Sequence, residues 1–559
     1  MRLVECVPNF SEGKDQAIID QIVSEITDVE GTELLDVDPG ADTNRTVVTF
    51  VGSPNAVEEA AFRVIKKASE LIDMSQHKGA HPRMGATDVC PFVPVTGVTM
   101  KDCVEIAKKV GERAGKELGI PIFLYEEAAQ HPDRQNLSIV RAGEYEGMSE
   151  KLKDPHWKPD FGPAEFNVKS GCTAVGAREF LIAFNVNFNT RDKKLVHDIA
   201  LNIRERGRLK KDADGKILRD EDGNKLRIEG LFKNCKAVGW YIPEYNMAQL
   251  SMNLTNCKIT SPHMAFDEIC KQAAERGIRV TGSELVGLIP KEAMLEAGRY
   301  FLEKQSQSAG VPEQELIRVA IQTMGLNDVA PFDPQKKIIE YRVAEHRPLA
   351  NMTVLGFADE LSIDSPAPGG GSVAALCGSL GAALASMVAN LTVPKKDYGQ
   401  VKERMCEIAR KAQDYKDAMM RALDDDTQAF NRVMDAMRMK KKTDEEKALR
   451  DKAIQETTRG AIMVPLVVMR NAIPIIDLAR ETALHGNQAS LSDACVGAIA
   501  ARAASEGAFL NVMINLPGIT DEGFVKNVTQ EAAMLLQEAR GKAAEVDQIA
   551  REGLGIEAE

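Results

Sequence analysis

The chain has little of what marks a membrane protein or a secreted protein. No uninterrupted apolar run reaches about 18 residues, the length that crosses a bilayer as a helix. The most apolar stretch, residues 374–391, carries Ser, Gly and Asn and therefore predicts a buried helix. The first residues show neither an extended apolar segment nor a small-residue cleavage site. We therefore expect no secretory signal, no membrane partner and a cytoplasmic protein.

Paired cysteines and an excess of basic charge are also lacking. The ten cysteines stand far apart and form no C-x-x-C pair, which predicts free thiols and no metal site. The formal net charge is −13, from 70 Lys and Arg against 83 Asp and Glu, and this argues against a nucleic-acid partner. An anionic ligand would have to be held by local clusters of Arg and Lys.

What the sequence does contain is two regions of different character, in a chain of 559 residues that exceeds what one hydrophobic core serves. In the first region, short β-branched segments alternate with amphipathic helical patterns, which predicts a two-lobed α/β part of α+β sandwich type. Its clearest patterns are strands at 46–52, 89–95 and 120–126 and helices at 55–73 and 100–119.

Residues 327–351 hold three prolines and no clear period, which marks a boundary. Beyond them, consecutive helical patterns rich in Ala and Leu predict an all-α helical bundle. The predicted domains are 1–180, 181–340 and 350–559, with a linker at 341–349.

An insertion in the second lobe, residues 210–227, carries two Asp-Gly turn signals around short polar runs. Such signals are typical of a solvent-exposed β-hairpin. A calcium-binding loop does not fit, because Asp212 and Asp214 run at once into Gly215 without the further ligands that such a loop needs.

Residues 77–95 raise the main chemical question. His77 and His81 stand four residues apart, but Gly79 and Pro82 indicate a loop, so a metal held on one helix face is not expected. A histidine in a loop just before a strand suits general acid–base chemistry, because imidazole titrates near neutrality and the strand fixes its position. The alternative is that His81 only hydrogen-bonds the turn, and the residues alone leave both open.

A second polar turn lies within residues 34–52. Asp36 and Asp38 fall on one face of a strand end, and the chain then passes through a turn to Asn44 and Arg45. Either this carboxylate pair meets donors of the loop, or both residues cap the turn.

The helical part begins with the glycine-rich stretch APGGGSVAAL, residues 367–376. Three glycines before Ser372 open a helix, and exposed N–H groups at such an end favour an anion. The alternative is a turn that lets two helices pack closely. A phosphate-binding loop does not fit, since G-K-[ST] is missing.

Three consecutive acids, Asp424, Asp425 and Asp426, interrupt a long helical pattern. Like charges repel at this spacing, so the three side chains must face either water or a polar cavity.

Several of these segments together resemble one family, in the order of the chain and nearly from end to end. Segments of the first part are similar to the formiminotransferase half of the formimidoyltransferase-cyclodeaminase family: residues 3–13, 36–52, 77–95, 159–166 and 176–187. Segments of the helical part are similar to its cyclodeaminase half: residues 365–388, 424–430, 443–447 and 509–522.

The resemblance implies a bifunctional enzyme of histidine degradation, both a transferase and a lyase. The first activity would transfer the formimino group from N-formimino-L-glutamate to N5 of tetrahydrofolate. The second would close that group onto N10, giving 5,10-methenyltetrahydrofolate and ammonia. Tetrahydrofolate would be a cosubstrate in polyglutamylated form, no metal would be required, and the chain would assemble as a homo-oligomer, as the family does.

The resemblance also implies catalytic roles. His81 would be the general base that removes the N5 proton, with Asp38 holding the imidazole or the intermediate. Asp426 would shuttle protons in the cyclodeaminase. Arg45 and Arg83 would bind carboxylates of the substrate, because a planar guanidinium meets a carboxylate through two hydrogen bonds.

Further positions are implied as binding residues. The folate segment of the family maps onto Gly162, Pro163, Ala164, Glu165, Phe166, Asn167, Val168, Lys169, Ser170 and Gly171. A folate carboxylate would lie against Gly369, Gly370, Gly371 and Ser372. Weaker candidates for the cyclodeaminase cavity are Asn487, Ser492 and Asp493.

The chain departs from the family pattern at two places. Lys169 and Ser170 stand before Gly171 where the family has a Trp, so Lys169 would favour an anionic polyglutamate tail over ring stacking. Ala80 stands where Glu is expected, which removes a polar partner near His81. The alternatives are a chain whose cyclodeaminase or methenyltetrahydrofolate cyclohydrolase-like half alone is active, and a folate-binding scaffold without turnover.

Overall fold

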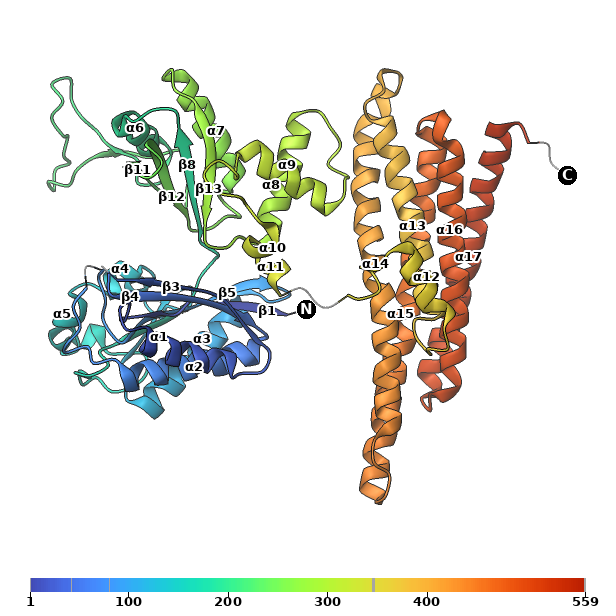
Figure 1. Cartoon of the computed structure of the whole chain (residues 1–559), viewed down its shortest axis with the longest axis horizontal. Helices are drawn as coiled ribbons and strands as arrows, with labels where there is room; N and C mark the ends of the chain where they lie inside the picture. Colours follow the sequence, from blue (N-terminus) through green and yellow to red (C-terminus); the bar gives the residue numbers. More distant parts are fainter. Residues whose placement is uncertain (1, 42, 80, 344–346, 557–559) are drawn as a thin grey trace. The chain divides into compact units, whose positions relative to one another are not determined.

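The computed structural model describes all residues except 1, 42, 80, 344–346 and 557–559. The chain divides into two compact units (Figure 1). We call Met1–Ala297 with Ala320–Ala344 the α/β unit, and Gly298–Val319 with Glu345–Glu559 the helical unit. The predicted α/β and all-α regions are both confirmed, whereas the predicted domain boundaries stay predictions.

A seven-stranded mixed sheet forms the first part of the α/β unit. Its strands are β1 (Leu3–Cys6), β2 (Asn9–Phe10), β3 (Thr32–Gly40), β4 (Arg45–Gly52), β5 (Thr87–Thr96), β6 (Ile122–Glu126) and β7 (Thr173–Ala177). The order is β1-β4-β2-β5-β7-β6, with β3 paired only to β4 at an edge. In β4, Val48 and Phe50 point into the main core, so Arg45 falls on the opposite face of the sheet.

Three amphipathic helices cover one face of this sheet (Figure 1). They are α1 (Gln16–Thr27), α2 (Pro54–Leu71) and α3 (Met100–Leu118). Each begins after a polar residue whose side chain accepts N–H groups of the first turn: Asp15, Ser53 and Thr99. A smaller cluster around Phe123 and Tyr125 packs with two short helices, α4 (Leu137–Val140) and α5 (Glu144–Lys151).

A four-stranded antiparallel sheet forms the second part of the α/β unit. In sheet order its strands are β11 (Cys235–Ile242), β12 (Met247–Leu254), β8 (Ile182–Phe188) and β13 (Val280–Val286). The helices of this region of the chain are α6 (Lys193–Ile203), α7 (Pro262–Glu275), α8 (Lys291–Lys304), α9 (Glu313–Met324), α10 (Pro334–Lys337) and α11 (Ile339–Arg342). The predicted hairpin insertion is confirmed, since β9 (Arg208–Leu209) pairs with β10 (Arg227–Ile228).

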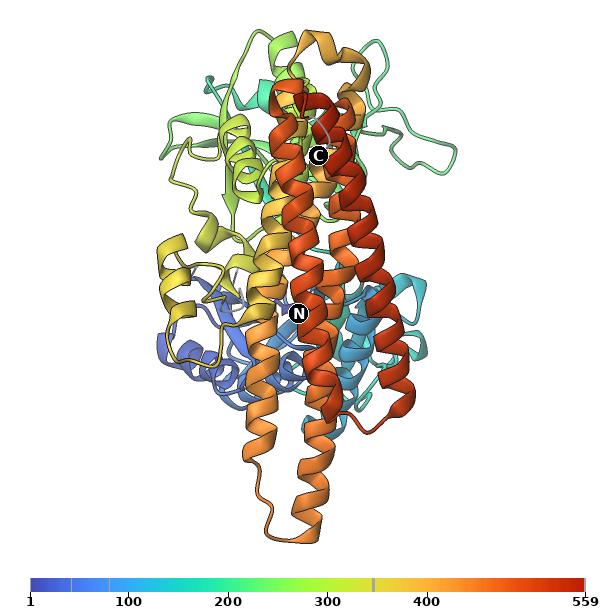
Figure 2. The same ribbon diagram turned by 90° about the vertical axis from the view of Figure 1, so that its right-hand side faces the viewer.

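Long helices make up most of the helical unit (Figure 2). They are α12 (Val354–Ser362), α13 (Gly370–Thr392), α14 (Lys402–Arg438), α15 (Asp444–His485), α16 (Leu491–Asn515) and α17 (Glu522–Leu554). Helix α13 packs against α14, α15 and α16. Small residues allow this close approach: a Cβ added at Gly381 of α13 would lie 2.7 Å from the carbonyl oxygen of Gly497 in α16.

Among the described residues, two helices are long and apolar enough to cross a membrane by length and composition, α13 and α15. The prediction that residues 374–391 form a buried helix is confirmed, since this stretch lies in α13 and most of the apolar window of α13 is buried. In each helix more than half of the most apolar window is buried within the structure, 61% in α13 and 56% in α15. A core helix of a soluble protein passes the same test, so these helices are weak evidence for a membrane partner.

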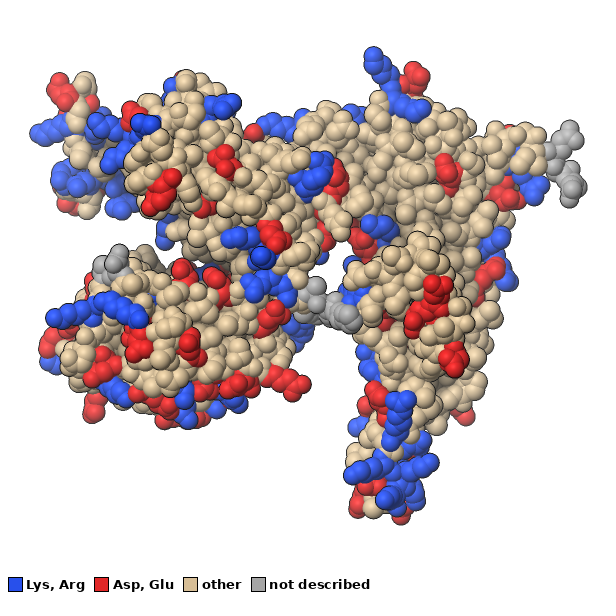
Figure 3. All heavy atoms as spheres, in the orientation of Figure 1, with Lys and Arg blue, Asp and Glu red and all other residues tan. Residues whose placement is uncertain are grey.

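None of the ten cysteines, all of which the structure describes, forms a disulfide, as predicted. Within the part of the chain that the structure describes, no three His, Cys, Asp or Glu side chains are grouped so that they could hold a metal ion. Lysine and arginine gather at the tip of the α14–α15 hairpin (Figure 3), where Lys440, Lys441 and Lys442 are exposed. Asp444 and Glu445 are exposed beside them, so the tip carries charges of both signs.

Candidate functional site

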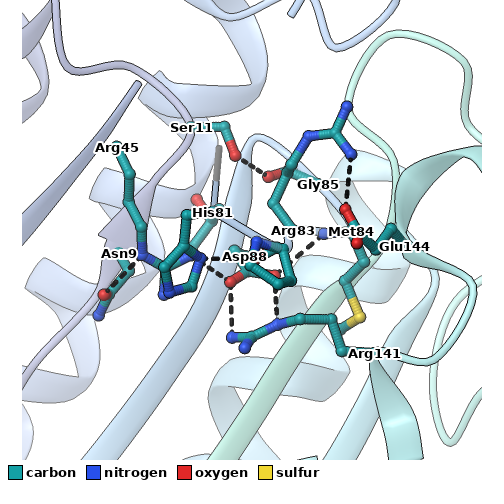
Figure 4. A network of polar contacts seen from close by, with 12 residues as sticks. Asn9, Ser11, Arg45, His81, Arg83, Met84, Gly85, Asp88, Arg141 and Glu144 are labelled. Atoms are coloured by element: carbon teal, nitrogen blue, oxygen red, sulfur yellow. Dashed lines mark hydrogen bonds and ion pairs between the residues drawn. The ribbon is translucent and has the colours of Figure 1, made fainter. Parts of the chain in front are cut away.

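The loop between α2 and β5 carries His81 and is held on two sides. A Cβ at Gly79 would collide with the carbonyl oxygen of Thr43 in the β3–β4 turn, and one at Gly85 would collide with the carbonyl oxygen of Cys172. Only glycine permits such close backbone contacts. Ser11 Oγ also donates to the Gly85 carbonyl oxygen at 2.7 Å (Figure 4). The loop is therefore positioned by the sheet on either side of it.

The His81 side chain is half-buried and oriented by its own turn. Its Nδ1 lies 2.7 Å from the carbonyl oxygen of Pro82. Because a carbonyl oxygen only accepts, the neutral imidazole carries its proton on Nδ1 and presents an unprotonated Nε2. The two roles predicted for this histidine are therefore compatible, since one nitrogen bonds the turn and the other remains able to accept a proton.

A buried carboxylate, Asp88 at the start of β5, ties together the charged groups beside His81 (Figure 4). It accepts hydrogen bonds from Arg45 Nη1 and from Arg141 Nη2, the latter at 2.7 Å, and from the backbone N–H of Met84 at 3.0 Å. A fully buried carboxylate with two guanidinium partners and a backbone donor is well satisfied. Asp88 thus fixes two cations next to the imidazole.

These surroundings set the protonation state of His81. Burial, then the positive charges of Arg45 and Arg141, hold its pKa below the ordinary 6.5, whereas the Pro82 hydrogen bond and Asp88 act in the opposite direction. The imidazole is therefore neutral at neutral pH, which is the form that a general base needs.

Arg83, predicted to bind a substrate carboxylate, is already engaged by protein acceptors. Its Nη1 and Nη2 donate to the two carboxylate oxygens of Glu146 at 2.8 and 2.7 Å, and Nη1 also donates to Glu144 at 3.2 Å. Its Nε donates to His77 Nδ1 at 3.2 Å, and His77 Nε2 donates to the Asn44 carbonyl oxygen at 2.9 Å. The carboxylate-binding role of Arg83 stays a prediction.

One predicted role of Asp38 was to hold the imidazole of His81. In the structure Asp38 is not paired with that imidazole. It lies on the edge strand β3 opposite Val47 of β4, and its side chain is exposed. Within the described residues it makes no hydrogen bond or ion pair. The carboxylate that acts on His81 is Asp88, because β5 carries it beneath the loop. Contact of Asp38 with the reaction intermediate stays a prediction.

The predicted folate segment, Gly162 to Gly171, meets the His81 loop at its C-terminal end. The backbone N–H of Ala86 donates to the Ser170 carbonyl oxygen at 2.8 Å, and that of Cys172 donates to the Met84 carbonyl oxygen at 2.9 Å. The first four residues of the segment are exposed, whereas its last two are buried. The structure therefore brings these two predicted regions together.

The two departures from the family pattern have different outcomes. Lys169 Nζ donates to the carbonyl oxygen of Glu70 near the end of α2 at 2.7 Å, and the side chain remains exposed. An exposed cation at this place can meet an anionic tail. Ala80 lies outside the described residues.

A cavity of about 670 Å³ lies beside the His81 loop. Gly79 and Arg83, on either side of His81, border this cavity, although His81 does not line it. Tyr145 joins the cavity to the folate segment, since its hydroxyl donates to the Val168 carbonyl oxygen at 2.5 Å. The volume is typical of a small-molecule site.

Two residues of the site were missed by reasoning from the sequence, Asp88 and Arg141. Asp88 did give a signal, as the lone acidic residue of 77–95 and the first charged residue of an otherwise apolar strand. A buried carboxylate in such a strand needs a cationic partner. Arg141 gave none, because it is distant from His81 in the chain and follows a helix of only four residues.

The second titratable site pairs Asp426 of α14 with the first turn of α13. Ser372 Oγ donates to Asp426 Oδ2 at 3.2 Å and to the Leu423 carbonyl oxygen at 3.0 Å. A Cβ at Gly371 would collide with the Asp426 carboxylate, so glycine makes room for it. Burial raises the pKa of Asp426 above the ordinary 3.8, whereas hydrogen bonds from Ser372 act in the opposite direction. A carboxylate whose pKa is raised is a stronger base and is better suited to take up and pass on a proton.

The glycine-rich opening of α13 is confirmed, with Gly369 as N-cap and Gly370 as the first helical residue. The backbone N–H of Ser372 also bonds Asp426. Part of this helix start is therefore occupied by a carboxylate of the protein itself, in keeping with the preference of helix N-termini for negative charge.

The three consecutive aspartates have different surroundings. Asp424 is 3% exposed and accepts the backbone N–H groups of Leu349 and Ala350 at 3.0 and 3.2 Å, so it anchors the chain where it enters the bundle. Asp425 is exposed. Asp426 alone of the three lies against the glycine-rich helix start, which explains how like charges are tolerated here.

The prediction that Asn487, Ser492 and Asp493 share the Asp426 cavity is wrong. The backbone N–H of Asn487 donates to Oγ1 of Thr392, the last residue of α13, at 2.9 Å, and α16 begins nearby with Leu491. Asp426 of α14 lies against the opposite end of α13, at its first turn. Helix α13 has 23 residues and is therefore about 35 Å long. The helix therefore holds the two groups apart.

Comparison with protein families matches models along most of the chain. Residues 3–178 match the N-terminal subdomain of the formiminotransferase domain, residues 183–344 match the formiminotransferase domain, and residues 353–534 match formiminotransferase-cyclodeaminase.

Relatives with assigned activities resemble either the whole chain or one part of it. The chain is 44% identical to the formimidoyltransferase-cyclodeaminase of Mus musculus over 97% of this chain and 98% of the mouse protein. It is 45% identical to the glutamate formimidoyltransferase of Streptococcus pyogenes serotype M1 over 54% of this chain and 94% of that protein. It is 41% identical to the methenyltetrahydrofolate cyclohydrolase of Methylorubrum extorquens over 34% of this chain and 91% of that protein. The chain belongs to the formimidoyltransferase-cyclodeaminase family.

Proposed function

We propose that the chain is a bifunctional folate enzyme. It transfers the formimino group of N-formimino-L-glutamate to tetrahydrofolate, and then converts 5-formiminotetrahydrofolate to 5,10-methenyltetrahydrofolate and ammonia. The observation that carries the proposal is the identity to the mouse bifunctional enzyme over 97% of the chain, which includes both units. The glutamate formimidoyltransferase and methenyltetrahydrofolate cyclohydrolase relatives support folate chemistry in the separate parts.

In the transfer, N5 of tetrahydrofolate attacks the formimino carbon and His81 Nε2 takes the proton that N5 loses. The bond between that carbon and the glutamate nitrogen then breaks, and the imidazole returns the proton to this nitrogen, so that L-glutamate leaves as the amine. Arg45 and Arg83 are the carboxylate ligands of this proposal, and Asp38 contacts the intermediate. The folate lies along the segment Gly162 to Gly171, next to the cavity that Tyr145 borders.

In the cyclisation, N10 attacks the formimino carbon of 5-formiminotetrahydrofolate, and the bond from that carbon to the imino nitrogen breaks. The substrate enters as an amidinium, which already carries two of the three hydrogens of ammonia. Asp426 takes the third from N10 and delivers it to the departing nitrogen. The glycines Gly369 to Gly371 offer N–H donors to a carboxylate of the folate, and Ser372, whose N–H bonds Asp426, completes this binding site.

We also propose that the chain forms a homo-oligomer through α13 and α16 of the helical unit. Leu380 and Leu391 of α13 are 53% and 46% exposed, and Leu510 and Ile514 of α16 are 67% and 76% exposed. Large apolar side chains exposed along two adjacent helices can form an interaction surface. The expected result of Ile514→Asp is a smaller particle by light scattering, with the wild-type chain as the control.

The remaining parts of the proposal concern conditions and cosubstrates. The folate is polyglutamylated, and the exposed Lys169 favours its anionic tail. The reaction needs no metal, the enzyme works in the cytoplasm, and neither a nucleic acid nor a membrane is a partner. Activity that survives exhaustive chelation, and a higher affinity for pentaglutamate than for monoglutamate folate, are the expected results.

Two assays of the full-length chain test the function. With N-formimino-L-glutamate and tetrahydrofolate, we expect L-glutamate, ammonia and 5,10-methenyltetrahydrofolate in equal amounts. With 5-formiminotetrahydrofolate alone, we expect ammonia and the methenyl product. Turnover in the second assay alone would mean that only the cyclodeaminase half is active, and folate binding without turnover in either assay would mean a scaffold.

A further inference from the structure

The arginines near His81 differ in how many donor groups remain for a ligand. Arg83 donates from Nε to His77, and from Nη1 and Nη2 to the carboxylates of Glu144 and Glu146. The pair with Glu146 is bidentate, which is the arrangement a substrate carboxylate would itself require. A substrate can reach this guanidinium only by displacing a protein carboxylate.

Arg45 and Arg141 use only part of their guanidinium N–H groups in hydrogen bonds to described residues. Arg141 donates from Nε and Nη2 to Asp88, at 3.3 and 2.7 Å, and Arg45 donates from Nε to Asn9 and from Nη1 to Asp88. Among the residues described, no acceptor is bonded to Nη1 of Arg141 or to Nη2 of Arg45. Each guanidinium is thus oriented by the protein and still has an end that can donate.

Arg141 is also held in place through its backbone. Lys151 Nζ donates to the carbonyl oxygens of Ile139, Val140 and Ala142, at 2.7, 2.7 and 3.3 Å. These residues flank Arg141 at the end of α4. The Arg141 side chain is 15% exposed, compared with 9% for Arg45. It can therefore reach a ligand while its position stays fixed, which lowers the entropy cost of binding.

The charge balance of this cluster favours an anion. The two guanidinium groups of Arg45 and Arg141 share a single carboxylate, Asp88, so one positive charge is left over. Because the cluster is largely buried, this charge is poorly screened by water. A ligand carboxylate placed here would lie beside His81 and would complete the charge balance.

We propose that Arg141, together with Arg45, binds a carboxylate of N-formimino-L-glutamate beside His81, with Asp88 as the positioning residue that holds the two guanidinium groups. This assignment rests on the proposed transferase function. It adds Arg141 to the carboxylate ligands Arg45 and Arg83, because Arg141, unlike Arg83, can bind a carboxylate without displacing a protein acceptor.

The first test measures steady-state kinetics of Arg141→Met in the full-length chain. We expect the KM for N-formimino-L-glutamate to rise roughly 10- to 100-fold, the range for a lost charge-assisted hydrogen bond, while the KM for tetrahydrofolate stays within about 2-fold. Fluorescence of Trp157 and Trp240 in the same preparation reports that the α/β unit, which contains Arg141, is folded. Arg113→Met, at a helix surface of the same unit where Arg113 pairs with Glu59, is the matched control and should change neither KM.

A second readout separates ligand binding from a merely structural role. Burial and the positive charges of Arg45 and Arg141 lower the pKa of His81, whereas the Pro82 carbonyl and Asp88 raise it. Arg141→Met should therefore move the acid limb of the kcat/KM profile to higher pH. Arg141→Lys keeps the charge and loses the planar fork, so it should leave that limb in place and raise the KM less.

Substrate analogues complete the test. In one analogue of N-formimino-L-glutamate the α-carboxylate is replaced by a carboxamide, and in a second the γ-carboxylate is replaced. For one of these two, Arg141→Met should add almost nothing to the loss already caused by the analogue, because the same contact is removed twice. Full additivity with both analogues would contradict the assignment.

The outcomes distinguish this inference from the function on which it rests. If Arg141→Met and Arg141→Lys both leave the KM for N-formimino-L-glutamate unchanged while His81→Ala is inactive in transfer, the assignment is wrong and the transferase proposal stands. If His81→Ala transfers at the wild-type rate, the assignment of His81 as the base is wrong, whereas absence of transfer by the wild-type chain would mean that the transferase proposal itself is wrong.

Discussion

His81 lies on a loop of the α/β unit among charged side chains, whereas Asp426 lies on a helix of the helical unit against glycine and serine. Burial acts on both groups and disfavours the charged form of each. It lowers the pKa of the imidazole and raises the pKa of the carboxyl. The same physical effect therefore keeps the imidazole in its unprotonated form and makes the carboxylate a stronger base, so each group is suited to take up a proton.

The neighbours of the two groups make different contributions. At His81, the cations Arg45 and Arg141 add to the effect of burial, so the protonation state depends on charge. At Asp426, Ser372 opposes burial, and the missing side chain of Gly371 provides the space that the carboxylate occupies. The first site should be most sensitive to changes of charge, and the second to changes of volume.

The largest expected effects come from removing each titratable group. His81→Ala should lower the transferase rate by about 10²- to 10⁴-fold, and Asp426→Asn should lower the cyclodeaminase rate by a similar factor, because general acid–base catalysis contributes this much. Both activities are measured on each full-length variant. Each variant is the control for the other, since the activity of the untouched unit should persist. Loss of both activities in either variant would break the comparison.

A third buried group, Glu5, tests whether burial also shifts the pKa of a side chain that lies outside the two sites. Glu5 of β1 is 3% exposed, and burial raises its pKa from 4.5 to about 7, with Arg178 opposing the rise and Glu340 adding to it. A raised pKa in the folded state means that folding takes up a proton, so stability is lost as pH rises from 4.5 through about 7.

Glu5→Gln should therefore stabilise the α/β unit above the folded-state pKa of Glu5, by at most about 3 kcal/mol, since one pKa unit corresponds to about 1.4 kcal/mol. Both tryptophans, Trp157 and Trp240, belong to the α/β unit, so urea unfolding followed by Trp fluorescence reports on this unit. At low pH, where Glu5 is protonated in both states, the variant and the wild type should be equally stable. A constant difference at all pH values would contradict the burial argument.

The volume argument predicts a loss of up to about 100-fold in cyclodeaminase rate for Gly371→Ala, because a misplaced catalytic group is costly. The added methyl group must push the Asp426 carboxylate from its position. Gly460→Ala is the matched control, since a Cβ at Gly460 in α15 meets nothing within 4 Å. That variant should keep full activity and gain roughly 0.5–1 kcal/mol of stability. An unchanged rate in Gly371→Ala would show that the contact is not needed.

The smallest expected effect is that of Ser372→Ala. The hydroxyl of Ser372 stabilises the charged form of Asp426, so its removal should raise the pKa of Asp426 further. Because Asp426 must be a carboxylate to take the proton from N10, the acid limb of the cyclodeaminase profile should move to higher pH. The change in maximal rate should stay below about 10-fold, given that one hydrogen bond is lost. A pH–rate profile measures both quantities. A shift of the limb to lower pH would contradict the assignment of Asp426.

Much of the fold could be predicted because its signals are local. The strand pattern at 46–52 and the helix pattern at 55–73 correspond to β4 and α2, since alternation and the helical repeat are properties of short segments. The Asp-Gly signals likewise predicted the exposed hairpin of β9 and β10. The site was predicted less completely, because Asp38 and Asp88 could not be ranked as partners of His81 without knowing which strand passes beneath the loop.

The sequence by itself determined that an α/β part precedes a helical part, and that a histidine loop and a glycine-rich helix start are the places to look for chemistry. Only the tertiary structure decided that Asp88 joins Arg45 to Arg141 and that Arg83 is taken up by Glu146. It also decided that Asn487 lies a helix length away from Asp426. The physical reason is that pattern is a property of neighbours along the chain, whereas charge pairing and desolvation depend on groups that meet only when the chain has folded.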